Sequence, residues 1–209
     1  MSNQVTTKVS GMRIFCIANQ KGGVGKTTTT VNLAAGLAQA GRRVLLVDLD
    51  PQGNATMGSG IDKRALDPTV YDVLLETTPI SAARKRSPTG GYDVLGANRE
   101  LAGAEVELVE LEHREKRLKL ALQAVKDDYD FVLIDCPPSL SMLTLNGLCA
   151  VQNGVINVFG LPHHRKYVFG VVRRVRIAGR VAEGVVHTVQ QRVGARRVGQ
   201  DELGARQTP

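Results

Sequence analysis

The 209-residue sequence predicts an α/β fold, built on a mainly parallel sheet with helices on both of its faces. Two observations predict this class. Apolar stretches of strand length alternate with helix-forming stretches through the first 150 residues. A glycine-rich segment also joins the first predicted strand to the first predicted helix. Such a segment needs a strand before it and a helix after it, so the order of the elements predicts the layers.

The first predicted strand covers residues 12–18, with the apolar sequence MRIFCIA, and the first predicted helix covers residues 27–40. Between them, three glycines occupy positions 22, 23 and 25. Because glycine has no Cβ, the backbone can curl tightly there and direct several N–H groups at one anion. The start of the helix adds a partial positive charge at the same place. The segment therefore predicts a phosphate-binding loop.

Two lysines and a threonine supply the side chains of this predicted loop. Lys26 would reach the β- and γ-phosphates of a nucleotide, and the Thr27 hydroxyl would hold Mg²⁺. The loop departs from the usual G-x-x-x-x-G-K-[ST] pattern, because Gln20 stands where that pattern has glycine. Lys21 is an additional lysine, in a place from which it can reach into a partner's site. The alternative, a glycine-rich turn made soluble by lysines, does not explain the order strand, glycines, Lys-Thr and helix.

Two further predicted strands end in acidic residues. Residues 43–50 (RVLLVDLD) end with Asp48 and Asp50, and Asp135 follows the strand predicted at 131–134. Ligands bind at the carboxyl ends of parallel strands. Asp135 is thus the best candidate to hold Mg²⁺ through water, and one of the other two acids is free to orient or deprotonate the attacking water. The alternative for a single acid after a strand is a turn or helix cap.

The middle of the chain carries weaker signals. Residues 51–54 predict a turn, or a mobile switch that senses the γ-phosphate, and residues 70–76 predict a short helix. Residues 101–126 predict one long helix or two, with His113 on the helix surface. The apolar stripe of this helical region consists of Leu108, Leu111, Leu118, Leu122 and Val125.

Four segments together resemble the ParA/Soj-type chromosome- or plasmid-partitioning ATPases. They read KGGVGKTTTTVNLA, VLLVDLDPQGNAT, LAGAEVELV and YDFVLIDCPPSLSMLTLNGL, and the resemblance runs from about residue 12 to about residue 158. It implies a P-loop NTPase three-layer fold with a mainly parallel sheet. The Asp-Pro-Gln-Gly segment at 50–53 favours the partitioning branch over the related cell-division-site and nitrogenase-iron-protein branches.

The resemblance implies a role for each site residue. Lys21 would cross a dimer interface to the partner's phosphates, and Asp50 would position the hydrolytic water, so that the catalytic residues are Lys21, Lys26 and Asp50. Asp48 would be a neighbouring metal-shell or switch carboxylate, which gives Thr27, Asp48 and Asp135 as the metal site. The implied nucleotide cradle is Lys21, Gly22, Gly23, Val24, Gly25, Lys26, Thr27 and Thr28.

The resemblance also implies ligands and partners. ATP and Mg²⁺ would be bound, the protein would form an ATP-dependent homodimer, and the ATP state would bind DNA non-specifically. A ParB-type centromere-binding protein would trigger hydrolysis. No apolar run approaches 18 residues and the first eleven residues are polar, so we expect a cytoplasmic protein with no membrane contact. The DNA binding that the resemblance implies would make it nucleoid-associated.

The resemblance divides the chain into three parts. These are a flexible N-terminal tail at 1–11, an ATPase domain at 12–158, and a divergent Arg/Val/Gly-rich tail of uncertain structure at 159–209. Residues 151–209 hold ten of the 27 basic residues and three of the 20 acidic ones, so they account for the whole net charge of +7. Because the family's pattern stops there, we expect the C-terminal part of the sheet to be incomplete.

Three interpretations of the divergent tail remain open. An Arg-rich stretch can bind DNA phosphates without sequence preference. It can instead be a solvated, disordered end, or the out-of-frame product of a frameshift in a GC-rich gene. We favour the frameshift, because the pattern and the expected length are lost together. The corresponding alternative for function is a truncated or frameshifted, non-catalytic remnant that binds nucleotide weakly or not at all.

Overall fold

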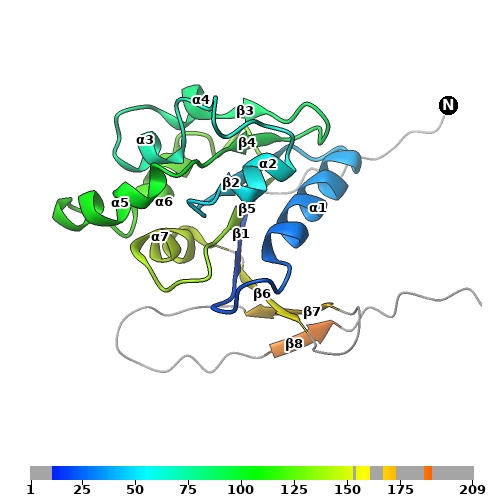
Figure 1. Cartoon of the computed structure of the whole chain (residues 1–209). Helices are drawn as coiled ribbons and strands as arrows, with labels where there is room; N and C mark the ends of the chain where they lie inside the picture. Colours follow the sequence, from blue (N-terminus) through cyan, green and yellow to red (C-terminus); the bar gives the residue numbers. More distant parts are fainter. Residues whose placement is uncertain (1–10, 153, 161–166, 173–185, 190–209) are drawn as a thin grey trace, which may run out of the picture.

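A computed structural model describes residues 11–152, 154–160, 167–172 and 186–189 (Figure 1). Its strands form one sheet with the order β3-β4-β2-β5-β1-β6-β7-β8. Neighbours from β4 to β6 pair in parallel, while β3 and β7–β8 pair antiparallel at the two edges. The strand bounds are β1 Arg13–Ala18, β2 Val44–Asp48, β3 Lys85–Arg86, β4 Asp93–Leu95, β5 Phe131–Asp135, β6 Gly154–Gly160, β7 Tyr167–Val172 and β8 Val186–Val189. The α/β class with a mainly parallel sheet is therefore confirmed.

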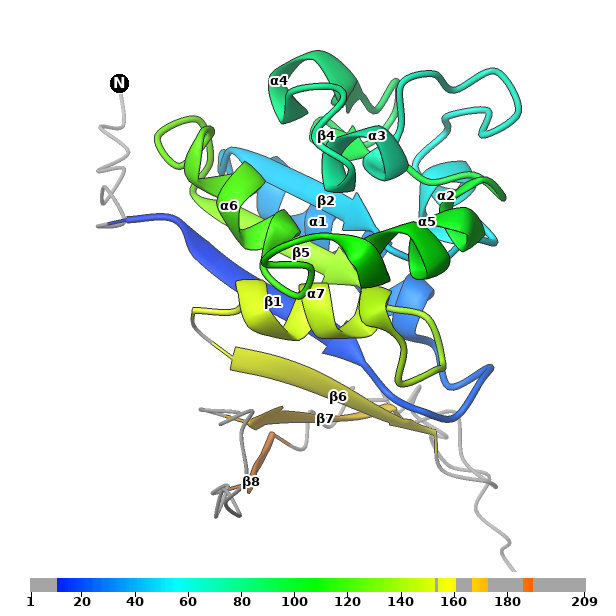
Figure 2. The ribbon, with the colours of Figure 1, turned by 90° about the vertical axis from the view of Figure 1, so that its left-hand side faces the viewer.

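Helices cover both faces of the sheet. Figure 2 shows α6 and α7 in front of β5 and β1, with α1 behind them. The three layers predicted from the sequence are present. The helix bounds are α1 Lys26–Gln39, α2 Asn54–Gly58, α3 Val70–Leu74, α4 Ile80–Ala83, α5 Leu101–Glu107, the 3₁₀ turn η1 Leu108–Glu110, α6 Arg117–Gln123 and α7 Met142–Ala150.

Alternation along the strands divides the apolar side chains between two cores. All five residues of β2 are buried. Leu45 and Val47 belong to the larger core, which also contains buried residues of α3, α5, α6 and α7, whereas Val44 and Leu46 belong to the smaller core with Ala34 of α1. Successive side chains of a strand point to opposite faces, so a strand covered by helices on both sides must be apolar throughout.

Three strands extend the described sheet beyond β1, and the incomplete C-terminal part stays a prediction, because most residues after 160 lie outside the described ranges. β6 pairs with β1 in parallel, and β7 and β8 then extend the sheet in antiparallel order. Their sequences, YVFGVV and VHTV, are rich in the β-branched and aromatic residues that favour strands. Only six residues separate β6 from β7, which is too few for the crossover that another parallel strand requires.

Other predictions for the two ends lie outside the described residues. This holds for the flexible tail at 1–11, apart from Gly11, and for most of the divergent tail, including all of its arginines. The three interpretations of that tail therefore stay predictions. Among the described residues, no helix is both long enough and apolar enough to cross a membrane.

The helical region predicted for residues 101–126 is broken in the middle. α5 and η1 end at Glu110, and α6 begins only at Arg117. The intervening residues 112–116 read EHREK and contain no apolar side chain that packing could hold in a helix. His113 is exposed, as predicted, but lies in the turn with a φ of 54° and not on a helix. The apolar stripe is confirmed, because Leu108, Leu118, Leu122 and Val125 are buried and Leu111 packs against the core.

Candidate nucleotide-binding site

The glycine-rich loop connects the end of β1 to the start of α1, as the sequence predicts. Gly23 and Gly25 have φ values of 69° and 94°, a region in which a residue with a Cβ is strained. Gly25 is the residue before α1, and no side chain caps the first N–H groups of that helix. These N–H groups are therefore free to donate to an anion at the positive end of the helix.

The two lysines of the loop have different surroundings. Lys26 is 6% exposed, and its Nζ donates to the Lys21 carbonyl oxygen at 3.3 Å, so its ammonium group lies over the loop. Lys21 is exposed, and its backbone N–H donates to Asn19 Oδ1 at 2.7 Å. The Lys26 side chain is thus held over the loop, whereas Lys21 is accessible to solvent.

A buried acid lies directly against this loop. Thr27 Oγ1 donates to Asp135 Oδ2 at 2.7 Å, which joins the start of α1 to the end of β5. Thr30 Oγ1 lies 3.1 Å from Asp135 Oδ1 and 2.9 Å from the Lys26 carbonyl oxygen, so it shares one proton between them. Burial raises the pKa of Asp135 to about 6, the two threonine hydroxyls oppose this rise, and the charge of Asp50 adds to it.

The Thr27 hydroxyl and the Asp135 carboxylate fit a magnesium ion. Both are hard oxygen donors, and Mg²⁺ is usually bound by one or two protein oxygens together with phosphates and water. Among the described residues, no group of three or more His, Cys, Asp or Glu side chains forms a metal cage. Thr30 was missed in the sequence, although it lies three residues after Thr27 and hence on the same face of the helix.

Asp48 is buried beside Asp135, because the two residues pair in register on the neighbouring strands β2 and β5. Its Oδ2 accepts hydrogen bonds from the backbone N–H and from the hydroxyl of Thr56, both at 2.8 Å. Its Oδ1 accepts from the Asp50 N–H at 3.1 Å. Burial, reinforced by the charge of Asp135, raises the pKa of Asp48 to about 7. Both carboxylate oxygens thus have donors within the protein.

Asp50 begins a turn over residues 50–53, although the sequence predicts it as the last residue of a strand, with the turn at 51–54. Strand β2 ends at Asp48, two residues earlier than predicted, because the chain turns once Asp48 accepts the Asp50 N–H. Asp50 Oδ1 accepts from the Gln52 N–H at 2.9 Å, and the Gly53 N–H donates to the Asp50 carbonyl at 2.8 Å. Gly53 has a φ of 59°, and a Cβ there would lie 2.6 Å from the Ala97 carbonyl oxygen. The turn is therefore held tightly against the segment after β4.

Thr56, a second residue that sequence reasoning missed, connects these parts. Its hydroxyl donates to Asp48 and accepts the Ala97 N–H at 2.9 Å, so α2, β2 and the end of β4 meet at one side chain. The structure thus gathers Lys26, Thr27, Asp48, Asp50 and Asp135 at the carboxyl edge of the sheet. Nothing in the local sequence marks Thr56, because its partners come from other elements.

Comparison with known proteins decides the family. The family described as an AAA domain matches residues 12–162. The sporulation initiation inhibitor protein Soj of Bacillus subtilis is 55% identical over 146 residues, which are 70% of this chain and 58% of Soj. The chain belongs to the ParA/Soj family of partitioning ATPases. The chromosome partitioning protein ParA of Myxococcus xanthus is 52% identical over 144 residues, 69% of this chain and 51% of that protein.

Solved structures confirm the P-loop NTPase fold of this family member. Cobyrinic acid a,c-diamide synthase from Mycobacterium smegmatis, with bound ATP analog and magnesium, matches with a TM-score of 0.70 and 49% identity over 74% of this chain and 63% of that one. A plasmid partition protein from Borrelia burgdorferi matches with a TM-score of 0.60 and 28% identity over 69% of this chain and 63% of that one. The chain spans about half the length of the curated relatives it matches.

Proposed function

We propose that this chain binds ATP with Mg²⁺ at the loop of residues 20–30 and hydrolyses it as a ParA-type partitioning ATPase. The observation that carries the proposal is the 2.7 Å hydrogen bond between Thr27 and Asp135, which joins a phosphate-binding loop to a buried acid. The bound ATP analog and magnesium of the mycobacterial relative support the choice of ligands.

Each residue has a distinct task in this proposal. The loop amides and Lys26 bind the β- and γ-phosphates, and Thr27 and Asp135 hold the metal. When bound, Mg²⁺ neutralises charge that develops on the phosphate oxygens. Asp50 lies in the turn beside this edge and orients the attacking water. For Asp48, the hydrogen bonds from Thr56 and Asp50 favour the role of switch carboxylate over that of metal ligand.

The assembly follows from family membership in the same proposal. Lys21, exposed at the surface, contacts the phosphates held by a second copy, so that closure requires ATP in a homodimer. The ATP-bound dimer binds DNA non-specifically, a ParB-type centromere-binding protein stimulates hydrolysis, and the protein is cytoplasmic and nucleoid-associated. The relatives named as chromosome partitioning proteins support this part.

The Lys26→Ala variant tests the nucleotide assignment. Loss of the buried ammonium group is expected to abolish ATP binding in calorimetry, while circular dichroism remains that of the native fold. Lys85→Ala serves as the matched control, because Lys85 is exposed on the edge strand β3. Unchanged affinity of Lys26→Ala for ATP would contradict the assignment.

A second candidate function is that of a remnant that binds nucleotide weakly or not at all. The observation that favours it is the extent of the matches, because the family match ends at residue 162 and the matched segments cover only 58% and 51% of the two partitioning relatives. A ligand that binds only the folded state raises the melting temperature. A folded protein whose melting temperature does not rise with ATP and Mg²⁺ would support the remnant over the enzyme.

A further inference from the structure

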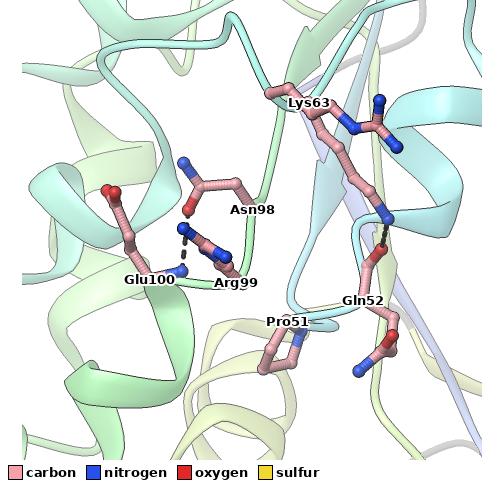
Figure 3. Close-up of a pocket in the computed structure, with 7 residues that line it drawn as sticks. Pro51, Gln52, Lys63, Asn98, Arg99 and Glu100 are labelled. Carbon is pink, nitrogen blue, oxygen red and sulfur yellow. Dashed lines mark hydrogen bonds between the residues drawn. The ribbon is translucent and has the colours of Figure 1, made fainter.

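A cavity of about 500 Å³ lies beside the turn that carries Asp50 (Figure 3). Pro51 and Gln52 of the turn form one wall, Lys63 and Arg64 form another, and residues 98–100 after β4 form the third. The cavity therefore lies beyond the carboxyl ends of β2 and β4, the edge at which parallel sheets bind ligands. Its volume falls in the range of sites for small molecules.

The lining of the cavity is positively charged. Lys63, Arg64 and Arg99 contribute three cations against the one carboxylate of Glu100. Within the part of the chain that the structure describes, neither the Arg64 nor the Arg99 guanidinium has an ion pair or side-chain hydrogen bond. Guanidinium groups bind carboxylates and phosphates through paired N–H donors. An anion between these cations would relieve their mutual repulsion.

One of the cavity's cations contacts the Asp50 turn directly. Lys63 Nζ donates to the Gln52 carbonyl oxygen (Figure 3), and the Gln52 N–H donates to Asp50 Oδ1 at 2.9 Å. A Cβ on Gly53 would lie 2.8 Å from Lys63 Cδ and 2.6 Å from the Ala97 carbonyl oxygen. The turn is thus enclosed between Lys63 and the end of β4. An anion in the cavity competes with Gln52 for the Lys63 ammonium group.

We propose that this cavity binds a carboxylate or phosphate group, and that binding changes the contact between Lys63 and the turn that holds Asp50. The site is separate from the phosphate-binding loop, which lies between β1 and α1. Its effect on turnover rests on the proposed role of Asp50. The binding step does not, and it can be measured without ATP.

Amide NMR of the full chain tests the binding step. Inorganic phosphate and malonate are titrated separately, with sodium chloride adjusted to hold the ionic strength constant. The amide signals of Gln52, Lys63 and Arg99 are expected to shift saturably with at least one probe, and the probe that shifts them identifies phosphate or carboxylate as the ligand. Gly22 and Gly23 report separately on the phosphate-binding loop. If neither probe moves the cavity signals, the proposal is overturned, whatever happens at the loop.

A pair of double variants with equal charge separates a built site from general attraction. Arg64→Gln with Arg99→Gln removes two cavity cations, and Lys85→Gln with Lys126→Gln removes two exposed cations elsewhere. The first pair is expected to weaken binding at the cavity signals by about tenfold or more, since hydrogen bonds to charged groups are lost. The second pair should leave the affinity of the cavity for the probe within about twofold of the unmodified protein at constant ionic strength. Equal weakening in both pairs would overturn the proposal.

Discussion

Three side chains, Thr27, Asp135 and Asp48, decide what the candidate site can do, and each is held by a hydrogen bond within the protein. Thr27 and Asp135 are 108 residues apart and form a 2.7 Å hydrogen bond. Asp48 accepts from Thr56 and Asp50, and so fixes the turn in which Asp50 lies. In our proposal, Thr27 and Asp135 bind the metal, and Asp48 positions the turn that contains Asp50.

The role of Asp50 is separable from nucleotide binding. Asp50→Ala is expected to bind ATP with the affinity of the unmodified protein but to lose turnover by about 10²–10⁴-fold, the usual contribution of a positioned acid or base. Calorimetry measures binding, and phosphate release measures turnover. Normal hydrolysis in this variant would move the water-orienting role to another residue.

The two buried acids predict a pH dependence of stability in the absence of nucleotide and metal. The folded-state pKa values of Asp48 and Asp135, about 7 and about 6, lie above the ordinary value of 3.8. The folded state therefore binds protons more tightly, and these two acids stabilise the fold least when ionised. Their contribution is expected to fall as the pH rises from about 4 to about 7.

Asp48→Asn checks this prediction, because the amide has a similar shape but does not titrate. Urea unfolding across the same pH range should show a flatter loss of stability in the variant than in the unmodified protein. The test is the slope of the free energy of unfolding against pH and not its absolute value, because the substitution also alters the hydrogen bonds of Asp48. Identical slopes would mean that Asp48 is already ionised at low pH in the folded protein.

The elements that position the site could be predicted from the sequence where the signal is local. The loop between β1 and α1 and the acids at the ends of β2 and β5 were correctly placed, because glycines, apolar stretches and terminal acids are contiguous in the chain. The break between η1 and α6 was not, because an apolar stripe continues on both sides of the polar residues 112–116. Thr56 and β7–β8 depend on partners from other elements, which local patterns do not show.

Asn146 of α7 shows how a side chain from one helix fixes the start of another, here α6. Its Oδ1 accepts the Leu118 N–H of α6 at 3.1 Å, and its Nδ2 donates to the Arg114 carbonyl at 2.7 Å. Replacing it with leucine leaves the buried Leu118 N–H without its acceptor and removes the donor to the Arg114 carbonyl, so Asn146→Leu is expected to cost about 1–3 kcal/mol in the free energy of unfolding. Urea titration measures this loss. Gln123→Leu, at an exposed position of α6, is the control and should change stability much less.

At the scale of the whole molecule, the residues of the candidate site lie at one edge of one sheet. With the order β4-β2-β5-β1 at the centre, the loop after β1, Asp135 at the end of β5 and the turn after β2 are neighbours in space. The family match covers this region and ends at residue 162. The sequence accordingly predicted the architecture of the central sheet. It did not predict the antiparallel strands β7 and β8, which extend the described sheet beyond β6.

Metal removal should act on this whole edge. ATP is expected to bind more weakly with EDTA than with Mg²⁺, because in our proposal Thr27 and Asp135 hold the metal that accompanies the nucleotide. In the Thr27→Ala variant the difference between the two conditions should shrink. Calorimetry in both conditions measures it, and an undiminished difference would show that Thr27 does not hold the metal.

The most direct test of the central claim is a calorimetric titration of the folded, unmodified chain with ATP and Mg²⁺. The account predicts saturable binding of one nucleotide per chain, at the loop where Lys26, Thr27 and Asp135 meet. A protein that unfolds cooperatively, and so is demonstrably folded, yet gives no heat of binding with ATP and Mg²⁺ would contradict it.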